Sequence, residues 1–398
     1  MKYPPFYRSL NITGLIFLLC GSMINCQNEK NISENQSKNY QHTMNTEKLF
    51  IGTYTGEGPD ESKGIYLVTR NIETGKLTFD SLLVEVENPT FQAISPDGRF
   101  LFTVSETANK GGSVYSYAIQ PDRSLKTINS QPTLGRSACH VSVNDDQTML
   151  FVANYTSGVF TYYHLSPDGT ISEPVEHYEY EGSGPHPNQN KSHPHQAMIS
   201  PDQKYVYVPD LGTDQIHMYV IQPYTGKLEA LDPASFHLPP GSGPRHMTFH
   251  PTLPVAYVIN ELNNTIQAMK YDESTGQLTA IELYSTLPDD FDDVSYCADI
   301  HISPDGQFLY GSNRGHNSLV IFRILSDSGQ LERVGFAPVH GDWPRNFHIS
   351  EDGRFVYVGN QKSGNISIFS RDNESGKLSL VDSTFGNTYA PVCITKAW

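Results

Sequence analysis

The sequence predicts an all-β fold, a seven-bladed β-propeller whose N- and C-terminal strands pair to close the ring. Short runs of Val, Ile, Tyr and Phe alternate with turns, and 31 Gly and 26 Pro among 398 residues are available to form those turns. A unit of about 50 residues repeats along the chain, which is a period typical of propeller blades. The two chain ends supply the strands of one further unit. We therefore expect radial closure rather than an open solenoid or a pair of sandwiches.

Each repeat begins with a hairpin whose turn resembles Ser-Pro-Asp-Gly, a sequence that favours a tight connection between strands. The six turns begin at Ser95, Asn144, Ser200, His250, Ser303 and Ser350. The second strands that follow begin at Phe100, Leu150, Tyr205, Ala256, Phe308 and Phe355. Third strands come next, for example at Val114, Ile216, Leu319 and Ile366. Turns of the Thr-Gly-Lys-Leu type then lead into weaker fourth strands, at Thr74, Thr225, Thr275, Ser328 and Ser375.

The chain ends complete a seventh blade. Residues 49–54 match a second strand and residues 64–68 match a third strand, but no first strand precedes them. Residues 389–395 match a first strand that lacks its partner. A single shared blade accounts for both observations.

One repeat is longer than the others because residues 181–190 are inserted before its first strand, and we expect this loop to lie on one face, near a site.

The N-terminus is expected to lie outside the propeller. Lys2 and Arg8 precede an apolar run from Leu10 to Ile24, which is too short to indicate a membrane span and is typical of a secretory signal. We assign residues 1–26 to a signal segment of the lipoprotein type, with Cys26 as the lipidated residue, residues 27–47 to a polar linker and residues 48–398 to the propeller. The expected location is exported, periplasmic or membrane-anchored. The alternatives are a cleaved signal without a lipid and a cytoplasmic protein.

The composition excludes some classes of partner. The formal net charge is −16, whereas proteins that bind nucleic acids carry basic faces. An anionic ligand therefore needs a local basic pocket. Beyond Cys26 only Cys139, Cys297 and Cys393 remain, an odd number that gives no disulfide framework. We predict no protein partner and no cofactor.

The most informative hairpin runs from Gly243 to Leu262. Its first strand opens with Arg245 and His246, and its second strand ends at Glu261. Antiparallel pairing places the start of one strand beside the end of the next. A guanidinium, an imidazole and a carboxylate are therefore expected to converge at one end of this blade.

The same two positions can be read in every blade. The pairs that open the first strands are Thr90/Phe91, Cys139/His140, His195/Gln196, Arg245/His246, Ala298/Asp299, Arg345/Asn346 and Ala390/Pro391. The pairs that end the second strands are Thr53/Tyr54, Ser105/Glu106, Asn154/Tyr155, Asp210/Leu211, Asn260/Glu261, Asn313/Arg314 and Asn360/Gln361. Both sets lie at the same end of the blades, and the opposite ends carry turn residues. One mouth of the channel is therefore expected to be ringed by His140, His195, Arg245, His246, Glu261, Asp299, Arg314 and Arg345.

Some of these residues have a structural alternative. The Asn residues that end second strands are ordinary turn formers, and His246 and His301 alternate with buried positions. The arginines are harder to explain in this way, because an unpaired guanidinium near a channel is costly without an anionic partner. His186, His193 and His195 fit no standard zinc spacing, so no metal site is predicted. The sequence contains no Gly-rich phosphate loop, Gly-x-Ser-x-Gly elbow or Cys-x-x-Cys motif.

The chain resembles the β-propeller lactonase family, which includes the propeller-type 6-phosphogluconolactonases and carboxy-cis,cis-muconate cyclase. The motifs that carry the resemblance are His195-Gln-Ala-Met-Ile-Ser-Pro-Asp, Gly243-Pro-Arg-His-Met-Thr-Phe-His-Pro, Asn260-Glu-Leu, Ala298-Asp-Ile-His-Ile-Ser-Pro-Asp-Gly, Pro344-Arg-Asn-Phe and Gly359-Asn-Gln-Lys-Ser. The resemblance covers residues 48–398 and implies that the catalytic residues are His195, Arg245, Glu261 and Arg314. Further contacts with the substrate are expected from His140, His246, Asp299, Arg345 and Gln361.

The expected function is hydrolysis of a small-molecule sugar lactone, with 6-phospho-D-glucono-1,5-lactone as the first expectation and 6-phosphogluconate as its product. Glu261 or His195 would activate water, Arg245 would stabilise the oxyanion, and Arg314 with Arg345 would hold a phosphate or carboxylate. The resemblance also implies the cytoplasmic pentose phosphate route, with which an export signal disagrees. The alternatives are a lactonising cyclase of the muconate type and a non-enzymatic surface binding propeller.

Overall fold

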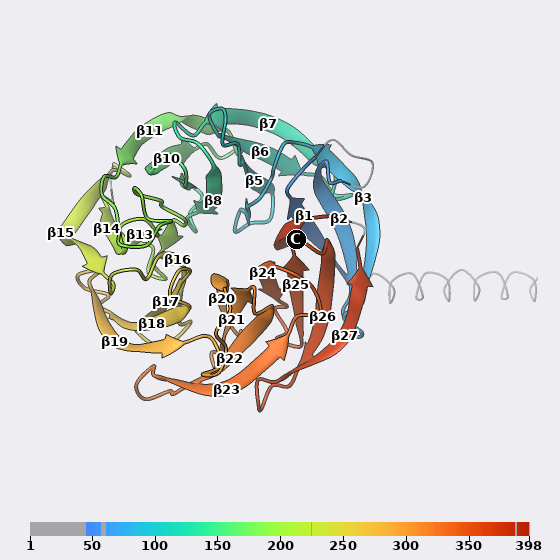
Figure 1. The fold of residues 1–398 in the computed structure, drawn as a ribbon. Helices are drawn as coiled ribbons and strands as arrows, with labels where there is room; N and C mark the ends of the chain where they lie inside the picture. The colour runs from blue at the N-terminus through green and yellow to red at the C-terminus, as the bar shows by residue number, and fades with distance from the viewer. Residues whose placement is uncertain (1–44, 57–60, 224, 387, 398) are drawn as a thin grey trace, which may run out of the picture. The chain divides into compact units, whose positions relative to one another are not determined.

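The computed structural model describes residues 45–56, 61–223, 225–386 and 388–397, which form seven antiparallel sheets of four strands around a central axis (Figure 1). Within these ranges no helix is long and apolar enough to cross a membrane. The expected signal segment, residues 1–26, and nearly all of the expected linker, residues 27–47, lie outside the described residues. The propeller forms one compact unit from residue 47 onward.

The sheets are numbered here as blades 1 to 7 in chain order. Blades 1 and 2 consist of β4 (Gln92–Ile94), β5 (Phe100–Ser105), β6 (Ser113–Ile119) and β7 (Leu125–Pro132), and of β8 (Ala138–Val143), β9 (Met149–Asn154), β10 (Val159–Leu165) and β11 (Ile171–Glu179). Blades 3 and 4 consist of β12 (Met198–Ile199), β13 (Tyr205–Asp210), β14 (Gln215–Ile221) and β15 (Leu228–His237), and of β16 (Pro244–Phe249), β17 (Val255–Asn260), β18 (Thr265–Tyr271) and β19 (Leu278–Ser285). Blades 5 and 6 consist of β20 (Tyr296–Ile302), β21 (Phe308–Arg314), β22 (Ser318–Ile324) and β23 (Leu331–Pro338), and of β24 (Pro344–Ile349), β25 (Phe355–Asn360), β26 (Asn365–Arg371) and β27 (Leu378–Phe385). Blade 7 consists of β28 (Pro391–Ala397), β1 (Thr46–Thr53), β2 (Gly64–Asn71) and β3 (Leu77–Glu85).

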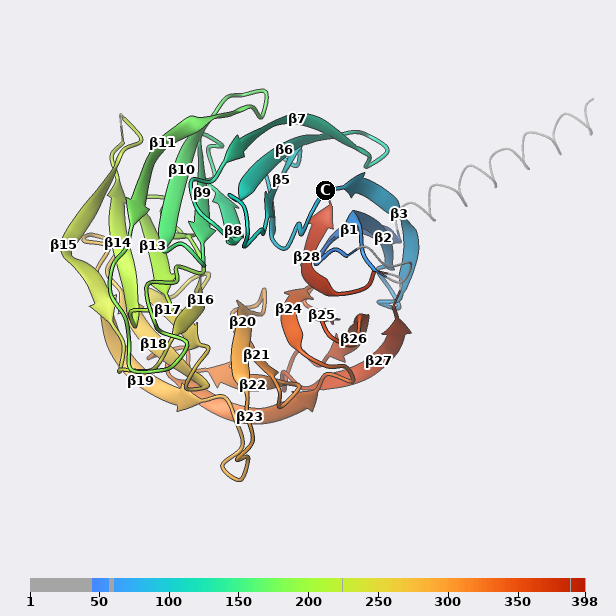
Figure 2. The ribbon, with the colours of Figure 1, turned by 45° about the horizontal axis from the view of Figure 1, so that its top comes forward.

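The predicted ring closure is confirmed in blade 7. Strand β28 from the C-terminus pairs antiparallel with β1, and Figure 2 shows the two strands side by side. The pairing runs from Lys48 opposite Ala397 to Thr53 opposite Pro391. The Ser62 hydroxyl also donates a hydrogen bond of 2.7 Å to the carbonyl oxygen of Thr388. The two chain ends therefore complete one sheet.

The expected pair that opens this last first strand, Ala390/Pro391, is wrong by two residues. Gly52 lies opposite Cys393, with a register shift beside it. In blade 4 the corresponding shift places Ile259 opposite His246. Cys393 is therefore the counterpart of His246. In the other blades a turn of the Ser-Pro-Asp-Gly type follows the first strand and indicates its register, and β28 has no such turn in the sequence.

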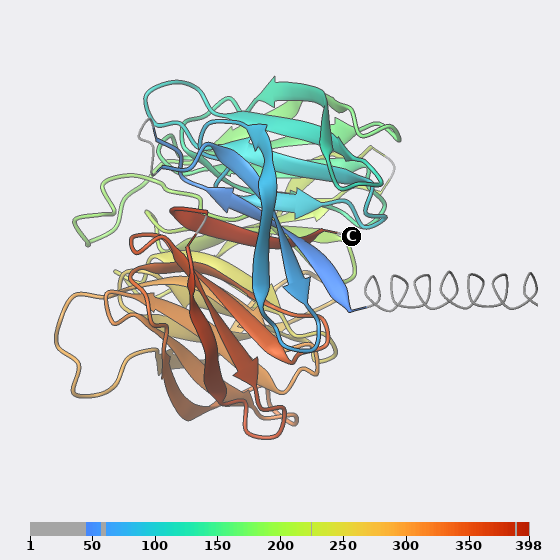
Figure 3. The ribbon, with the colours of Figure 1, turned by 90° about the vertical axis from the view of Figure 1, so that its right-hand side faces the viewer.

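The core lies between the faces of neighbouring blades. The second strands β5, β9, β13, β17, β21 and β25 are buried along their whole length, whereas the outer strand of each blade alternates between partly buried and exposed positions. Burial on both faces explains why the second strands read as continuous Val, Tyr, Phe and Leu runs. Figure 3 shows the ring from the side, with long loops projecting from one face.

A tyrosine on the second strand fastens several blades to the next blade. The Tyr357 hydroxyl of blade 6 donates a hydrogen bond of 2.9 Å to the carbonyl oxygen of Gly75 in blade 7. Gly75 has a φ of +72°, and a Cβ added to it would lie 2.3 Å from the ring of Phe355. The Thr-Gly-Lys-Leu turn thus requires glycine for its backbone angle and for the close approach of the neighbouring blade. Equivalent bonds at other junctions join Tyr207 to Gly276, Tyr257 to Gly329 and Tyr310 to Gly376.

We expect Tyr357→Phe to lower the free energy of unfolding by about 1 kcal/mol, because Phe fits the site but leaves the Gly75 carbonyl without its partner. Phe already stands at the corresponding position of blade 7, as Phe50. Denaturant unfolding of the variant and the wild type measures the change. Tyr115→Phe is the control, since no hydrogen bond of the Tyr115 hydroxyl occurs within the described part of the chain. Equal stability of Tyr357→Phe and the wild type would contradict this account of the junction.

Candidate active site

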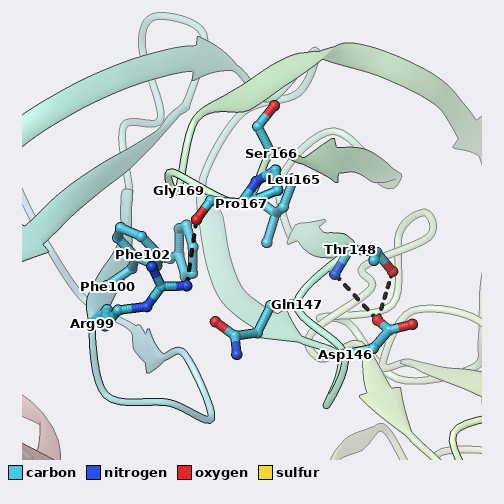
Figure 4. Close-up of a pocket in the computed structure, with 10 residues that line it drawn as sticks. All are labelled: Arg99, Phe100, Phe102, Asp146, Gln147, Thr148, Leu165, Ser166, Pro167 and Gly169. Atoms are coloured by element: carbon cyan, nitrogen blue, oxygen red, sulfur yellow. Dashed lines mark hydrogen bonds between the residues drawn. The ribbon is translucent and has the colours of Figure 1, made fainter.

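The two ends of the channel differ in chemistry. At one end, called the mouth here, the first strands begin and the second strands end. The other face carries the hairpin turns, where a pocket of about 160 Å³ lies between blades 1 and 2 (Figure 4). Its charged groups bond one another or nearby backbone: the Asp146 carboxylate accepts from Thr148, and Arg99 donates to the carbonyl oxygen of Pro167. The converging charged groups lie at the mouth.

Glu261 is the centre of the charged cluster at the mouth. Its Oε2 lies 2.7 Å from Nη2 of Arg314 and 3.1 Å from Nε of Arg245. Arg245 comes from the bulged start of β16, Glu261 directly follows β17, and Arg314 ends β21. Blades 4 and 5 therefore bring together three of the four residues that the sequence analysis expects to be catalytic.

Arg245 is held at this place by unusual surroundings. Its side chain is 2% exposed, and its Nη1 donates a 2.5 Å hydrogen bond to the carbonyl oxygen of Ala298 in the next blade. The N–H group at its Nε makes no hydrogen bond, because Oε2 of Glu261 lies close to Nε but is not aligned with the N–H direction. Burial, followed by repulsion from Arg314 and Arg345, lowers the pKa of Arg245 to about 10. The guanidinium remains charged at neutral pH.

Glu261 stays ionised in spite of its burial. Burial acts to raise its pKa, but attraction by Arg314 and then Arg245 outweighs burial, so the pKa of Glu261 lies below its ordinary value. A carboxylate held in this way accepts protons poorly. Its evident effect is to fix the positions of two guanidinium groups.

His195, the fourth expected catalytic residue, lies beside this cluster just ahead of β12. Its ring centre is 5.2 Å from that of His246 and 5.4 Å from that of Tyr155, in edge-to-face contacts. Burial, followed by the positive charge of Arg245, holds the pKa of His195 well below 6.5. The imidazole is therefore neutral at neutral pH and able to accept a proton.

A second charged group lies across the mouth, between blades 6, 7 and 1. Arg345 stands 3.8 Å from Oε2 of Glu106, and its guanidinium lies over the Tyr54 ring at 5.3 Å. Glu106 accepts hydrogen bonds from Tyr54 at 2.8 Å and from Thr90 at 2.7 Å. Arg345 itself makes no hydrogen bond within the described part of the chain, so its donors can take an anion. Although burial opposes its charge, Tyr54 and Glu106 hold the pKa of Arg345 above its usual value.

Tyr54 and Glu106 stand in the predicted pairs that end the second strands, but they were not expected to belong to the site. Glu261 and Arg314 are, like them, the second members of such pairs. The signal was therefore available in the second members, whereas the first members Thr53, Ser105 and Asp210 bond to groups of their own blade or of the loop that enters it.

A belt of contacts between neighbouring blades holds three more of the expected residues. Asp299 is 3% exposed, accepts a hydrogen bond of 2.6 Å from the Asn346 amide, and lies 2.9 Å from Nδ1 of His246 and 3.0 Å from Nε2 of His301. Nδ1 of His140 accepts a weak hydrogen bond of 3.4 Å from the backbone nitrogen of Ala197, which precedes β12 of the next blade. Although burial acts to raise it, the attraction of His301 holds the pKa of Asp299 well below its ordinary value.

Gln361 stands apart from the Glu261 cluster. It lines a separate cavity of about 300 Å³ at the rim, together with Tyr54 and Lys362. Its side-chain carbonyl oxygen is buried and accepts no hydrogen bond from the described residues. The structure thus brings Gln361 to the mouth but not to the centre of the charged groups.

The asparagines that end the second strands bond to groups of their own blade or to the loop that enters it, as expected of structural residues. Asn154 and Asn313 are completely buried, and their amide nitrogens donate to the carbonyl oxygens of Thr133 and Thr286. These side chains support the ends of the strands from which Tyr155 and Arg314 extend.

The inserted loop, residues 181–190, is fixed beside the mouth. The Gln189 amide donates to a carboxylate oxygen of Asp214 at 2.7 Å, and His193 stacks on Tyr155 with ring centres 4.4 Å apart. His193 also contacts the backbone oxygen of Tyr155 at 2.9 Å. His193, which follows the loop, therefore supports Tyr155, whose ring contacts His195. Within the described ranges, no three His, Cys, Asp or Glu side chains form a group that could hold a metal ion.

Trp343, which precedes β24, has a backbone conformation that large side chains rarely adopt. Its φ is +69°, and a left-handed conformation costs a residue with a side chain about 1–2 kcal/mol. The Asn317 side chain accepts a hydrogen bond from the Trp343 backbone nitrogen. Two cations lie over its ring, Arg314 at 5.5 Å and Lys362 at 3.3 Å from the ring centre. Trp343 could not be predicted to belong to the mouth, because a lone tryptophan in a loop gives no sequence pattern.

Comparison with known proteins gives a consistent result. Residues 48–395 match the family described as lactonase, 7-bladed beta-propeller. A Bacillus subtilis protein named 6-phosphogluconolactonase is 37% identical over 299 residues, which are 75% of this chain and 83% of that protein. A Formosa agariphila protein of the same name is 36% identical over 306 residues, 75% of this chain and 85% of that protein. The structure of a Pseudomonas aeruginosa periplasmic gluconolactonase superposes with a TM-score of 0.83 and 32% identity, covering 88% of this chain and 99% of that one.

We expect the free energy of unfolding to fall as the pH is lowered from 7.5 to 5. Burial lowers the pKa of His246 to about 4 and of His348 to about 3, and it also holds the pKa values of His140 and His195 well below 6.5. The unfolded chain then binds more protons in this window, so stability rises with pH. His301 has the opposite effect, because burial acts to lower its pKa but the attraction of Asp299 outweighs burial and raises it. This is one histidine against the four with lowered pKa values.

Denaturant titrations at the two pH values measure this dependence, and His348→Gln is expected to reduce it because one of the depressed groups is removed. Stability that is constant or greater at pH 5 would show that these imidazoles are not held neutral.

Proposed function

Because the chain belongs to the seven-bladed β-propeller lactonase family, we propose that it hydrolyses a sugar lactone, with 6-phospho-D-glucono-1,5-lactone as substrate and 6-phosphogluconate as product. The observation that carries the proposal is the buried Arg245–Glu261–Arg314 cluster beside a neutral His195. Lactone hydrolysis needs a base for water, donors for the oxyanion and an anchor for the rest of the substrate. Each requirement has a candidate at the mouth.

His195 is the better candidate for the general base. Its pKa lies below its ordinary value because burial and Arg245 disfavour the charged form, so the ring is unprotonated at neutral pH. Glu261 is ionised as well, but its carboxylate is engaged by two guanidinium groups. Proton transfer to His195 would not break an ion pair, whereas transfer to Glu261 would weaken two.

The proposed reaction begins when His195 takes a proton from water and the water oxygen bonds to the lactone carbonyl carbon. The carbonyl oxygen becomes an oxyanion, which Arg245 stabilises by charge and by its unaligned Nε–H. When the carbonyl forms again, the bond from the carbonyl carbon to the ring oxygen breaks. The ring oxygen takes the proton from His195 and leaves as the C5 hydroxyl. The acid produced then ionises, and His195 is neutral again.

Glu261 has a positioning role in this mechanism. It neutralises part of the repulsion between Arg245 and Arg314, which otherwise share a dry site. Arg245 and Arg314 lie at ion-pair distance from Glu261, and Arg345 lies 3.8 Å from Glu106. Asp299 also attracts Arg245, but its carboxylate is engaged by His246 and His301. A protein with a net charge of −16 thus gathers three guanidinium groups at one place. These groups support an anionic substrate.

Unphosphorylated gluconolactone is the second candidate substrate. We propose that residues 1–26 export the protein as a lipoprotein anchored through Cys26, and a phosphorylated sugar is a less accessible substrate outside the cytoplasm. The likeness to a protein titled a periplasmic gluconolactonase favours the same candidate. Purified protein assayed with both lactones separates the two candidates, and absence of turnover of either would favour the non-enzymatic propeller.

Arg245→Ala is expected to lower kcat by about 100-fold or more, in line with the loss of one oxyanion donor. Turnover of 6-phospho-D-glucono-1,5-lactone, followed by proton release in a weakly buffered solution, measures the effect. Arg99→Ala, on the turn face, is the matched control and is expected to keep full activity. A fully active Arg245→Ala enzyme would remove this guanidinium from the mechanism.

Cys26→Ala is expected to move the protein from the membrane fraction to the soluble fraction of its host, because a lipid attached to Cys26 is the proposed anchor. Fractionation and immunoblotting, with metabolic labelling by a fatty acid, measure the change. Wild-type protein found unlabelled in the cytoplasm would reject both export and lipidation.

A further inference from the structure

The mouth carries a tryptophan in a left-handed conformation. It stands two positions before the pair that opens the first strand, and in five blades the residue at this position has a positive φ. Four of the five are small or polar, namely Asn88, Ser137, Gly243 and Ala390, with φ values of 46°, 56°, 65° and 42°. Among these five, blade 6 alone has a large ring, Trp343 at 69°. The repeated backbone conformation does not explain the tryptophan, which is an uncommon choice at positive φ.

The ring of Trp343 supports a lysine at the rim of the mouth. Nζ of Lys362 lies 3.3 Å from the ring centre, while Arg314 lies over the same ring at 5.5 Å. A cation over a tryptophan face is attracted by the ring and needs no carboxylate to hold it. Lys362 has no ion pair with any residue in the described ranges. Its charge therefore remains available to a ligand.

Lys362 is also exceptional among the blades. It is the second residue after β25, and the corresponding residues of the other blades are uncharged: Thr55, Thr107, Thr156, Gly212, Leu262 and Gly315. The ring beneath Lys362 is that of Trp343, in the same blade. A cation and the aromatic residue that positions it thus occur together at one place on the rim. Arg345, whose guanidinium makes no hydrogen bond with the described residues, follows Trp343 by two positions.

We propose that Lys362, positioned by Trp343, recognises a phosphate group on the substrate, at a distance from the lactone carbonyl. This inference rests on the proposed lactonase function and assigns its specificity. Arg245 and His195 act at the reacting carbonyl, whereas Lys362 and Trp343 select lactones that carry a phosphomonoester at the far end. An ammonium group gains more from a phosphate dianion than from a neutral hydroxyl.

Lys362→Met tests the proposal, because Met keeps an apolar chain over the ring and removes the charge. We expect KM for 6-phospho-D-glucono-1,5-lactone to rise about 10-fold, the loss of one charge-assisted contact, with kcat nearly unchanged. The kcat/KM for unphosphorylated glucono-1,5-lactone should stay within about twofold of wild type. Competitive inhibition by 6-phosphogluconate should weaken by the same factor as KM rises.

Two further variants separate recognition from folding. Arg136→Met removes an exposed cation from the loop that enters blade 2 at the same end of the ring, and it should change neither substrate. Trp343→Gly is expected to fold, because Gly243 has the same backbone angle in blade 4, but to lose the preference for the phosphorylated lactone. Trp343→Phe keeps a ring beneath Lys362 and should restore most of that preference.

The outcomes distinguish this inference from the function on which it rests. A wild-type enzyme that hydrolyses both lactones without preference, or a Lys362→Met enzyme with unchanged KM for the phosphorylated lactone, overturns the phosphate site and leaves the lactonase function intact. A wild-type protein that hydrolyses neither lactone overturns the proposed function itself.

Discussion

Closure of the ring by β28 and β1 is the constraint on which the site depends. The charged groups at the mouth come from residues as distant in sequence as Tyr54 and Arg345, and only a closed circle of hairpins brings them to one rim. Within each blade, the antiparallel register places the start of the first strand beside the end of the second, so residues from both strands reach the mouth. The chemistry at the mouth is thus a consequence of how the two chain ends meet.

The cluster at the mouth balances charge without eliminating it. A buried guanidinium is costly, and Arg245 tolerates its burial because Glu261 lies 3.1 Å away and a backbone carbonyl accepts one of its N–H groups. Arg345 has a more distant carboxylate, at 3.8 Å, and an aromatic face instead of a hydrogen bond. Arg245 is therefore held in place by protein groups but keeps one N–H without an aligned acceptor, and Arg345 keeps capacity for a ligand. This difference between the two arginines suits a site that must hold its catalytic groups in place and also bind an anion.

The sequence allowed the fold, the closing blade and the convergence of Arg245, Glu261 and Arg314 to be predicted, because each depends on periodic turns and hairpin geometry alone. The features of the site that the sequence did not reveal depend on the direction in which side chains point. The register shift between Pro244 and His246 breaks the alternation along the strand, so His246 joins the belt between blades rather than the open mouth. The position of Trp343 follows from a backbone angle that no local sequence pattern announces.

The tyrosine junctions also make the ring uneven. The tyrosine occurs in blades 3, 4, 5 and 6, and phenylalanine stands in its place in blades 7, 1 and 2, as Phe50, Phe102 and Phe151. Four junctions thus carry a phenol-to-backbone bond from the second strand. On the phenylalanine arc the same position is filled by an apolar ring, and side chains elsewhere bond across the junctions, from Ser116 to Gly169, from Asn129 to Ile171 and from Ser142 to Ala197. Glu106, Tyr54 and Tyr155 stand on the phenylalanine arc, whereas Arg245, Glu261 and Arg314 stand on the tyrosine arc, so the two groups of polar side chains at the mouth belong to blades that are joined in different ways.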